Sequence, residues 1–188
     1  MTELLDLQKR QKEHDRDHHE DIYTLPYPDR MNHYVLHFSK YVGRLSRDYG
    51  DEERLQEQLE KTLADSFIVA LAAANTLNLD LQEELVEMFG LEESDLDGWA
   101  KELNPADDTM DLEELQEWWF RRMATPTGRM SNALESLDHM EPINVREILE
   151  EDTVEIISNL LIVSDNLPSD LYEVLDNRWT EIEENSIL

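Results

Sequence analysis

The sequence predicts an all-α protein. Apolar residues recur at three- and four-residue spacing through most of the chain, which is the period of an amphipathic helix. No stretch alternates apolar and polar residues over six positions, and the 188 residues include only five glycines, so β-hairpin signals are missing. In addition, one helical hairpin occurs twice along the chain, which indicates a helical bundle with pseudo-twofold symmetry.

The repeated hairpin is found by aligning residues 59–88 with residues 149–178 at an offset of 90. Eight of the thirty aligned positions are identical: Leu59/Leu149, Glu60/Glu150, Leu71/Leu161, Leu77/Leu167, Asp80/Asp170, Leu81/Leu171, Glu83/Glu173 and Leu85/Leu175. Each copy consists of an amphipathic helix, a turn, a long helix with an apolar middle, and a short helix. A duplicated hairpin can pack on itself, so that one copy keeps a site while the other becomes scaffold.

Four helices are expected in the N-terminal half. The first, residues 2–21, ends before the prolines of residues 26–28, because proline and the residue before it resist helix. The second, residues 29–47, has an apolar side made of Met31, Tyr34, Val35, Phe38, Tyr41, Val42 and Leu45. A turn at Gly50 leads to a long helix over 51–77, and a short helix over 80–89 stops at Gly90.

The middle of the chain is expected to connect the two copies. The pattern Ser94-x-x-Asp97 predicts the start of a short helix that extends to Leu103, and residues 104–108 form the clearest linker. A helix over 110–123 follows, with three aromatic residues, Trp118, Trp119 and Phe120. The segment Thr125-Pro126-Thr127-Gly128 is then expected to break the chain.

The second copy begins with a helix over 129–140. Asn144-x-x-Glu147 is a capping box that predicts the long helix 145–167, and Asp170 is expected to cap the last helix together with Ser169. The chain is therefore divided into an N-terminal helix and linker (1–28), a first repeat (29–91), connecting helices (92–127) and a second repeat (128–188).

Composition limits the classes of function. The chain has 45 acidic and 16 basic residues, a net charge of −29, with the acids spread over every polar helix face. This is typical of a salt-adapted protein, and it disfavours nonspecific binding to nucleic acid or to anionic membranes. There is no cysteine, and the longest apolar run, residues 67–74, is too short to span a bilayer. Since the N-terminus also lacks the layout of a signal peptide, we expect a cytoplasmic protein.

Four carboxylates in the second copy form a candidate metal site. Glu135 and Asp138 lie three residues apart on one helix, and Asp152 and Glu155 lie three apart on the next, so each pair shares a helix face. If the two helices pack antiparallel, the four groups can converge, and a divalent cation would relieve their repulsion. Oxygen ligands in this number suit Mg²⁺ or Mn²⁺.

This pattern resembles that of the MazG-like all-α nucleoside triphosphate pyrophosphohydrolases, which include the dimeric dUTPases. That family carries Glu-x-x-Glu on one helix and Glu-x-x-Asp on the next, and Glu135-x-x-Asp138 with Asp152-x-x-Glu155 has this spacing. The family's long helix ends in an apolar run, then Asn or Asp, then Leu-Gly-Ile-Asp-Leu; residues 72–81 and 163–171 are similar. The resemblance covers roughly residues 31–90 and 129–185.

The resemblance implies metal-assisted attack of water on the α-phosphate of a nucleoside triphosphate, which releases pyrophosphate. The four acids would hold the ions, and one of them would orient or deprotonate the water. Asn75 or Asp165 would contact the sugar or base, and a tryptophan of the connecting helix would stack on the base. A homodimer is a further expectation.

The first copy departs from the family pattern. Lys40 and Arg44 stand where acids are expected on its first helix, and Thr62 replaces the first acid of its long helix, which leaves Asp65 alone. One carboxylate beside two cations is expected to form an ion pair rather than a metal site. Alternatively, Lys40 and Arg44 would bind triphosphate oxygens across the pseudo-dimer.

Two other interpretations remain open. The four acids also fit a solvated, salt-adapted surface, and the chain also fits an inactive MazG-like relative that serves as a protein-interaction or nucleotide-sensing module. Two histidine sets also have spacing suitable for a transition metal such as Zn²⁺. One is His14, His18 and Asp21, for which solvation is the simpler expectation, and the other is His33 and His37, for which packing is.

Overall fold

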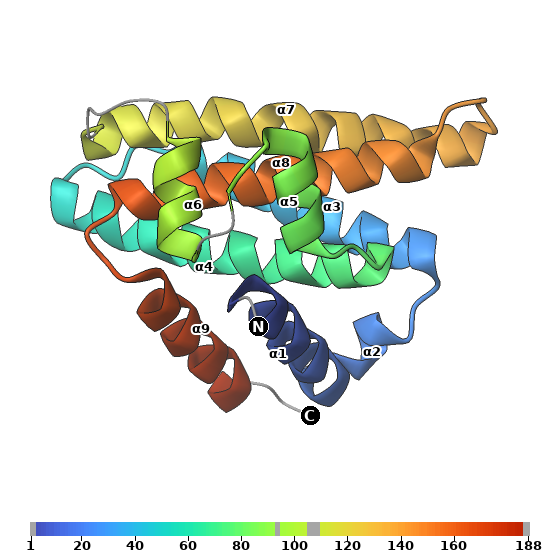
Figure 1. Cartoon of the computed structure of the whole chain (residues 1–188), viewed down its shortest axis with the longest axis horizontal. Helices are drawn as coiled ribbons and strands as arrows, with labels where there is room; N and C mark the ends of the chain where they lie inside the picture. Colours follow the sequence, from blue (N-terminus) through green and yellow to red (C-terminus); the bar gives the residue numbers. More distant parts are fainter. Residues whose placement is uncertain (1–2, 93–94, 105–109, 186–188) are drawn as a thin grey trace.

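The computed structural model describes residues 3–92, 95–104 and 110–185, except for the side chains of Glu3 and Asp138 (Figure 1). Within these ranges the chain forms helices and no strand, so the prediction of an all-α fold is confirmed. The helices are α1 (Glu3–His18), α2 (Glu20–Tyr23), α3 (Tyr27–Leu45), α4 (Glu52–Leu77), α5 (Leu81–Phe89), α6 (Leu96–Leu103), α7 (Leu112–His139), α8 (Val145–Asn166) and α9 (Leu171–Asn185).

Four long helices form a central bundle. Helix α3 packs against α4 and α7, and α8 packs against α4 and α7, so that each helix has two principal neighbours. Neighbouring helices run antiparallel, as the colour gradient in Figure 1 shows. Helices α1 and α9 cover α4 on one side, whereas α5 and α6 pack against α8.

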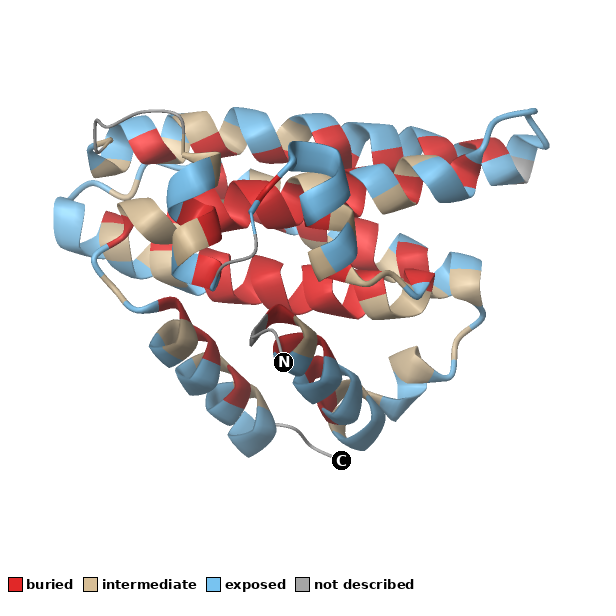
Figure 2. Ribbon diagram, viewed as in Figure 1, coloured by how far each residue is buried: buried red, intermediate tan, exposed pale blue. Residues whose placement is uncertain are grey.

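The core lies between α4 and α8. Every residue of α4 from Thr62 to Ala74 is buried, and so is every residue of α8 from Asp152 to Val163 except Glu155 (Figure 2). Three fully buried tryptophans, Trp99, Trp119 and Trp179, extend this core to α6, α7 and α9. Thus the apolar middle of each long helix is enclosed on all sides, which accounts for its lack of a polar face.

Helix ends follow the local capping signals. Asp51, Asp111 and Asn144 accept hydrogen bonds from backbone N–H groups in the first turns of α4, α7 and α8, and Gly90 ends α5 with a φ of 69°. Asp170 bonds the Glu173 N–H at 2.9 Å, as expected at the start of α9. At α6 the cap is Asp95, which bonds the Gly98 N–H at 2.8 Å, while Ser94 and residues 105–108 of the expected linker lie outside the described residues.

The expected break at residues 125–128 is wrong. Helix α7 is continuous from Leu112 to His139 with Pro126 inside it, so the boundary expected between residues 127 and 128 falls within one helix. Proline at position 126 removes the N–H that would bond the Arg122 carbonyl one turn earlier. The Asn159 side chain of α8 donates to that carbonyl at 3.5 Å instead. Tertiary contact therefore compensates for the proline.

No single helix of the described residues is long and apolar enough to cross a membrane. Only the pair α4 and α5 together has the length and apolar composition of a membrane span, and these two helices are bent by 97° relative to each other.

The compensation for Pro126 by the Asn159–Arg122 hydrogen bond can be tested by a double-mutant cycle. Asn159→Leu should lower the free energy of unfolding by about 1 kcal/mol, because the Arg122 carbonyl loses its donor. In a Pro126→Ala background the same substitution should cost much less, because the backbone N–H that alanine supplies then bonds that carbonyl. Urea unfolding of the four proteins measures the coupling, and an Asn159→Leu effect that is equal in both backgrounds would contradict the proposed compensation.

Candidate functional site

Two of the four predicted metal ligands lie together, and an arginine joins them. Arg129 of α7 bonds Asp152 of α8 through Nε at 2.7 Å, and its Nη2 contacts both Asp152 and Glu155. Asp152 is 1% exposed, whereas Glu155 is partly exposed and Arg129 is half-exposed. The guanidinium therefore occupies the position between the two carboxylates that a cation would take.

Glu135 is not part of this cluster. It lies six residues beyond Arg129 on α7, which corresponds to about 9 Å along the helix axis. Its carboxylate is exposed and lies 3.8 Å from His139 on the same helix. The side chain of Asp138 lies outside the described residues. Within the described part, no group of three or more His, Asp and Glu side chains is arranged to hold a metal ion.

The electrostatic environment of Asp152 reflects this pairing. Burial raises the pKa of Asp152, and the hydrogen bond and charge of Arg129 partly offset that effect. Conversely, the hydrogen bonds to Asp152 and Glu155 raise the pKa of Arg129 above its usual value. One carboxylate oxygen, Asp152 Oδ2, is buried without a hydrogen-bond partner. Removal of Arg129 would leave a buried and uncompensated negative charge.

The first hairpin contains a comparable cluster. Arg44 of α3 bonds Asp65 of α4 at 2.5 Å, which confirms the expected ion pair. The second oxygen of Asp65 accepts from Arg178 Nε of α9 at 2.6 Å, a contact that the sequence did not indicate. All three side chains are largely buried, so Asp65 is held by two arginines from two different helices.

Lys40 does not reach Asp65 directly. Its ammonium group lies 3.2 Å from His37 Nδ1 and 4.8 Å from the centre of the Tyr41 ring. Burial lowers the pKa of Lys40, and Arg44 adds to that effect. Thr62, which occupies the position of an acid in the family pattern, is buried in the core.

The two residues expected to contact a nucleotide, Asn75 and Asp165, bond segments that flank the bundle. Asn75 Nδ2 donates to the Gln8 carbonyl of α1 at 2.8 Å, and Gln8 returns a bond to the Leu79 carbonyl at 2.9 Å. Asp165, which the expected repeat aligns with Asn75, accepts from Asn104 Nδ2 at 3.1 Å. Asn75 therefore fixes α1, and Asp165 fixes the end of α6.

The aromatic residues of α7 also have structural positions. Trp119 is fully buried in the core, so its ring is not available to stack on a base. Trp118 is partly buried, and its ring lies 5.6 Å from the Arg122 guanidinium.

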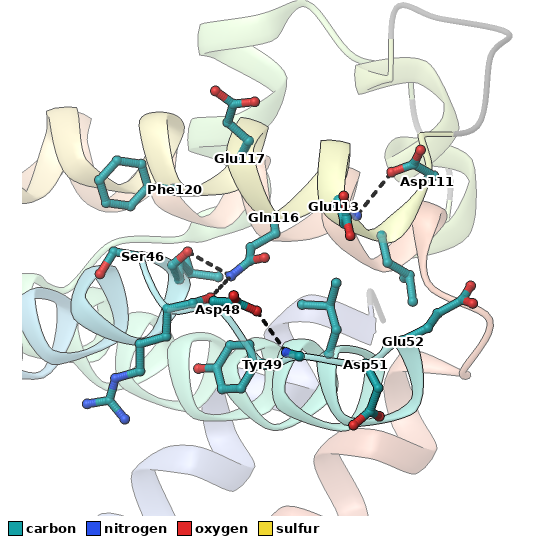
Figure 3. A pocket seen from close by; sticks show the side chains of 15 residues that line it. Ser46, Asp48, Tyr49, Asp51, Glu52, Asp111, Glu113, Gln116, Glu117 and Phe120 are labelled. Atoms are coloured by element: carbon teal, nitrogen blue, oxygen red, sulfur yellow. Dashed lines mark hydrogen bonds between the residues drawn. The ribbon is translucent and has the colours of Figure 1, made fainter.

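A cavity of about 910 Å³ lies where the α3–α4 turn meets the N-terminal end of α7 (Figure 3). Gln116 Nε2 bridges its walls by donating to the Leu45 carbonyl at 2.9 Å and the Arg47 carbonyl at 2.8 Å. Several acids line the cavity, but Asp51 and Asp111 are helix caps. Hence these two acids are explained by local structure.

Another cavity, of about 250 Å³, lies between α1, α3 and the C-terminal part of α4. Asp15, Arg30 and Tyr34 are among its lining residues. Burial raises the pKa of Asp15 to about 7, although a 2.7 Å hydrogen bond from Gln11 opposes the shift. Gln11 in turn accepts from Trp179 Nε1 at 2.7 Å, which links the cavity wall to α9.

Comparison with known proteins adds no family. No family model, no curated protein and no solved structure matches this chain.

Asp15 should make stability depend on pH. Its folded pKa is about 7 and its usual value is 3.8, so the stability gained from the protonated form is complete below about pH 4 and is lost as the pH rises through 7. Asp15→Asn keeps the acceptor for Gln11 and does not titrate. As the pH rises from 4 to 8, the free energy of unfolding of the variant should therefore increase relative to that of the wild type, by on the order of 2 kcal/mol. Urea unfolding across this range measures the difference.

The control is Asp6→Asn, which removes an exposed acid from the same helix. A stability difference between Asp15→Asn and the wild type that stays constant from pH 4 to 8 would show that Asp15 titrates normally.

Proposed function

We propose that this chain is a MazG-like bundle of two hairpin units that has lost metal-dependent hydrolysis and acts through protein–protein contacts. The order of elements supports the repeat, because α3, α4 and α5 correspond to the second part of α7, α8 and α9. The observation that carries the functional proposal is the contact of Arg129 with both Asp152 and Glu155.

The other residues of the expected nucleotide site support the same conclusion. Arg44 is bound to Asp65, Asn75 to Gln8, and Asp165 to Asn104. A triphosphate would have to displace these intramolecular partners before it gained any contact. The active pyrophosphohydrolase, with Mg²⁺ or Mn²⁺ on Glu135, Asp138, Asp152 and Glu155, remains the second candidate, because Asp152 Oδ2 has no hydrogen-bond partner.

An apolar tip favours an interaction role. The last turn of α7 and the segment that joins it to α8 expose Leu137, Met140 and Ile143, and Met140 is 90% exposed. Met140 also has a φ of 54°, a left-handed conformation that costs a residue with a Cβ atom. A strained residue with an exposed apolar side chain is expected where function rather than folding selects it. The proposed partner is a second molecule of this chain. Each molecule has a net charge of −29, and concentrated salt would screen the repulsion between the two.

The first test asks whether Arg129 serves as the counter-ion of Asp152 in the folded protein. Arg129→Met should lower the free energy of unfolding by about 2 kcal/mol, because it leaves Asp152 buried without a counter-ion. The double variant Arg129→Met/Asp152→Asn should recover most of that loss. Arg121→Met, which breaks an exposed ion pair on the same helix, should change stability by less than about 0.5 kcal/mol.

These proteins should also be assayed for pyrophosphate release from a panel of nucleoside triphosphates, with Mg²⁺ or Mn²⁺ in high salt. The proposed interaction role requires that the wild type release no pyrophosphate. If the wild type releases pyrophosphate and Asp152→Asn abolishes that release, the interaction role is wrong and the pyrophosphohydrolase is the function.

The second test concerns the tip. Met140→Gly should raise the free energy of unfolding by about 1 kcal/mol, because glycine adopts a positive φ without strain. The same substitution should weaken self-association by about tenfold or more. Light scattering and sedimentation in concentrated salt measure the association, with Leu36→Gln as an exposed apolar control on α3. A wild type that stays monomeric, or a Met140→Gly variant that associates equally well, would refute this interface.

A further inference from the structure

We infer that His14, His18 and His19 form a binding site for a divalent transition metal of the Zn²⁺ class, at the junction of α1 and α2. The site is separate from the acid–arginine clusters of the bundle, and it does not depend on the proposed function. Five of the six histidines of the chain lie between residues 14 and 37, although the chain as a whole is dominated by carboxylates.

His14 is the residue that requires an explanation. It is 5% exposed, which differs from the solvated position expected from the sequence, and neither ring nitrogen has a hydrogen-bond partner. A buried polar group without a partner is costly. Burial, together with the neighbouring His19 and His18, lowers the pKa of His14 to about 4. An imidazole nitrogen without a hydrogen-bond partner is free to bind a transition metal.

The spacing of the three rings suits a shared ion. His14 and His18 lie one helical turn apart, with ring centroids at 4.9 Å, and the His19 centroid lies 5.4 Å from that of His14. Two imidazoles that bind one tetrahedral ion through bonds of 2.0–2.1 Å have their centroids about 5 Å apart. Both observed separations are close to this value.

The backbone places the third ligand at a suitable point. His19 is the residue between α1 and α2, with φ −137° and ψ 44°, so its side chain leaves the α1 helical path. His18 and His19 are partly exposed. Since the described residues contain no finished three-ligand site, their rings must rotate toward His14 when the ion binds. Three neutral nitrogen ligands would leave a fourth position for water.

The second histidine pair is less suited to a metal. His33 and His37 have ring centroids 4.5 Å apart, but His37 Nδ1 already lies 3.1 Å from the Tyr41 hydroxyl and 3.2 Å from Lys40 Nζ. An ion at this pair would face an ammonium group, which disfavours cation binding.

A metal at His14 would join the last turn of α1 to α2. Helix α1 is held on α4 by the Gln8–Asn75 hydrogen bonds near its beginning, and the ion would fix its opposite end. Binding to the folded state alone raises stability, so Zn²⁺ should raise the melting temperature.

The experiment is a calorimetric titration of the full chain with Zn²⁺ at pH 7.5, in excess Mg²⁺. Magnesium prefers oxygen ligands and therefore occupies the surface carboxylates, which leaves nitrogen sites to be detected. We expect one saturable site per chain. His18→Asn and His19→Asn should each weaken it by about tenfold or more, and the double variant should abolish it. His139→Asn, which removes an exposed histidine elsewhere, should leave the affinity unchanged.

His14→Phe should remove both the site and the zinc-dependent rise in melting temperature. If His14→Phe does not fold, the His18 and His19 variants still decide the question. Co²⁺ provides an independent signal, because its visible absorption reports nitrogen ligands in tetrahedral geometry. No saturable binding in excess Mg²⁺, or equal binding by the wild type and the His18→Asn/His19→Asn variant, would overturn the proposal.

Discussion

The bundle depends on the neutralisation of carboxylates that are buried between its helices. Asp65 and Asp152 lie in the apolar middle of α4 and α8, where an isolated charge would oppose folding. Each is held by an arginine from the preceding bundle helix, Arg44 or Arg129. Because both partners belong to the same chain, each of these two buried carboxylates has a counter-charge within the fold. The same pairing aligns the two helices of each hairpin along their axes, since the ionic groups must meet at one level.

Side-chain hydrogen bonds attach α1 and the end of α6 to the central bundle. Asn75 near the end of α4 and Asp165 near the end of α8 are aligned in the proposed repeat, and each bonds a side chain or carbonyl group of a segment outside its helical hairpin. The position that would contact a nucleotide in a MazG-like enzyme is thus used to attach α1 in one half and the end of α6 in the other. Residues that the family pattern assigns to chemistry are therefore engaged in contacts within this fold, which supports the proposed interaction role.

Local sequence signals predicted most helix boundaries but not the site. Caps such as Asp51 and Asn144 act within one turn of the chain, so the residues alone reveal them. The continuity of α7 through Pro126 depends on Asn159, 33 residues later, and no local pattern contains that information. The expected break also placed Arg129 at a helix start, where its contact with Asp152 could not be anticipated. Arg178 is 113 residues from Asp65, and its contact depends on how α9 folds back onto α4.

The net charge of −29 affects which side chains can bind a cation selectively in this molecule. Dispersed carboxylates attract every hard cation in solution, so a magnesium site made of four acids would compete with the rest of the surface for ions. Arginine avoids this competition, because an internal guanidinium cannot exchange with solvent ions. Imidazole avoids it differently, since its nitrogen selects transition metals over Mg²⁺ and alkali ions. In so acidic a chain, a selective metal site is therefore best built from histidine, and the proposed site uses the buried ring of His14, whose nitrogens have no hydrogen-bond partner.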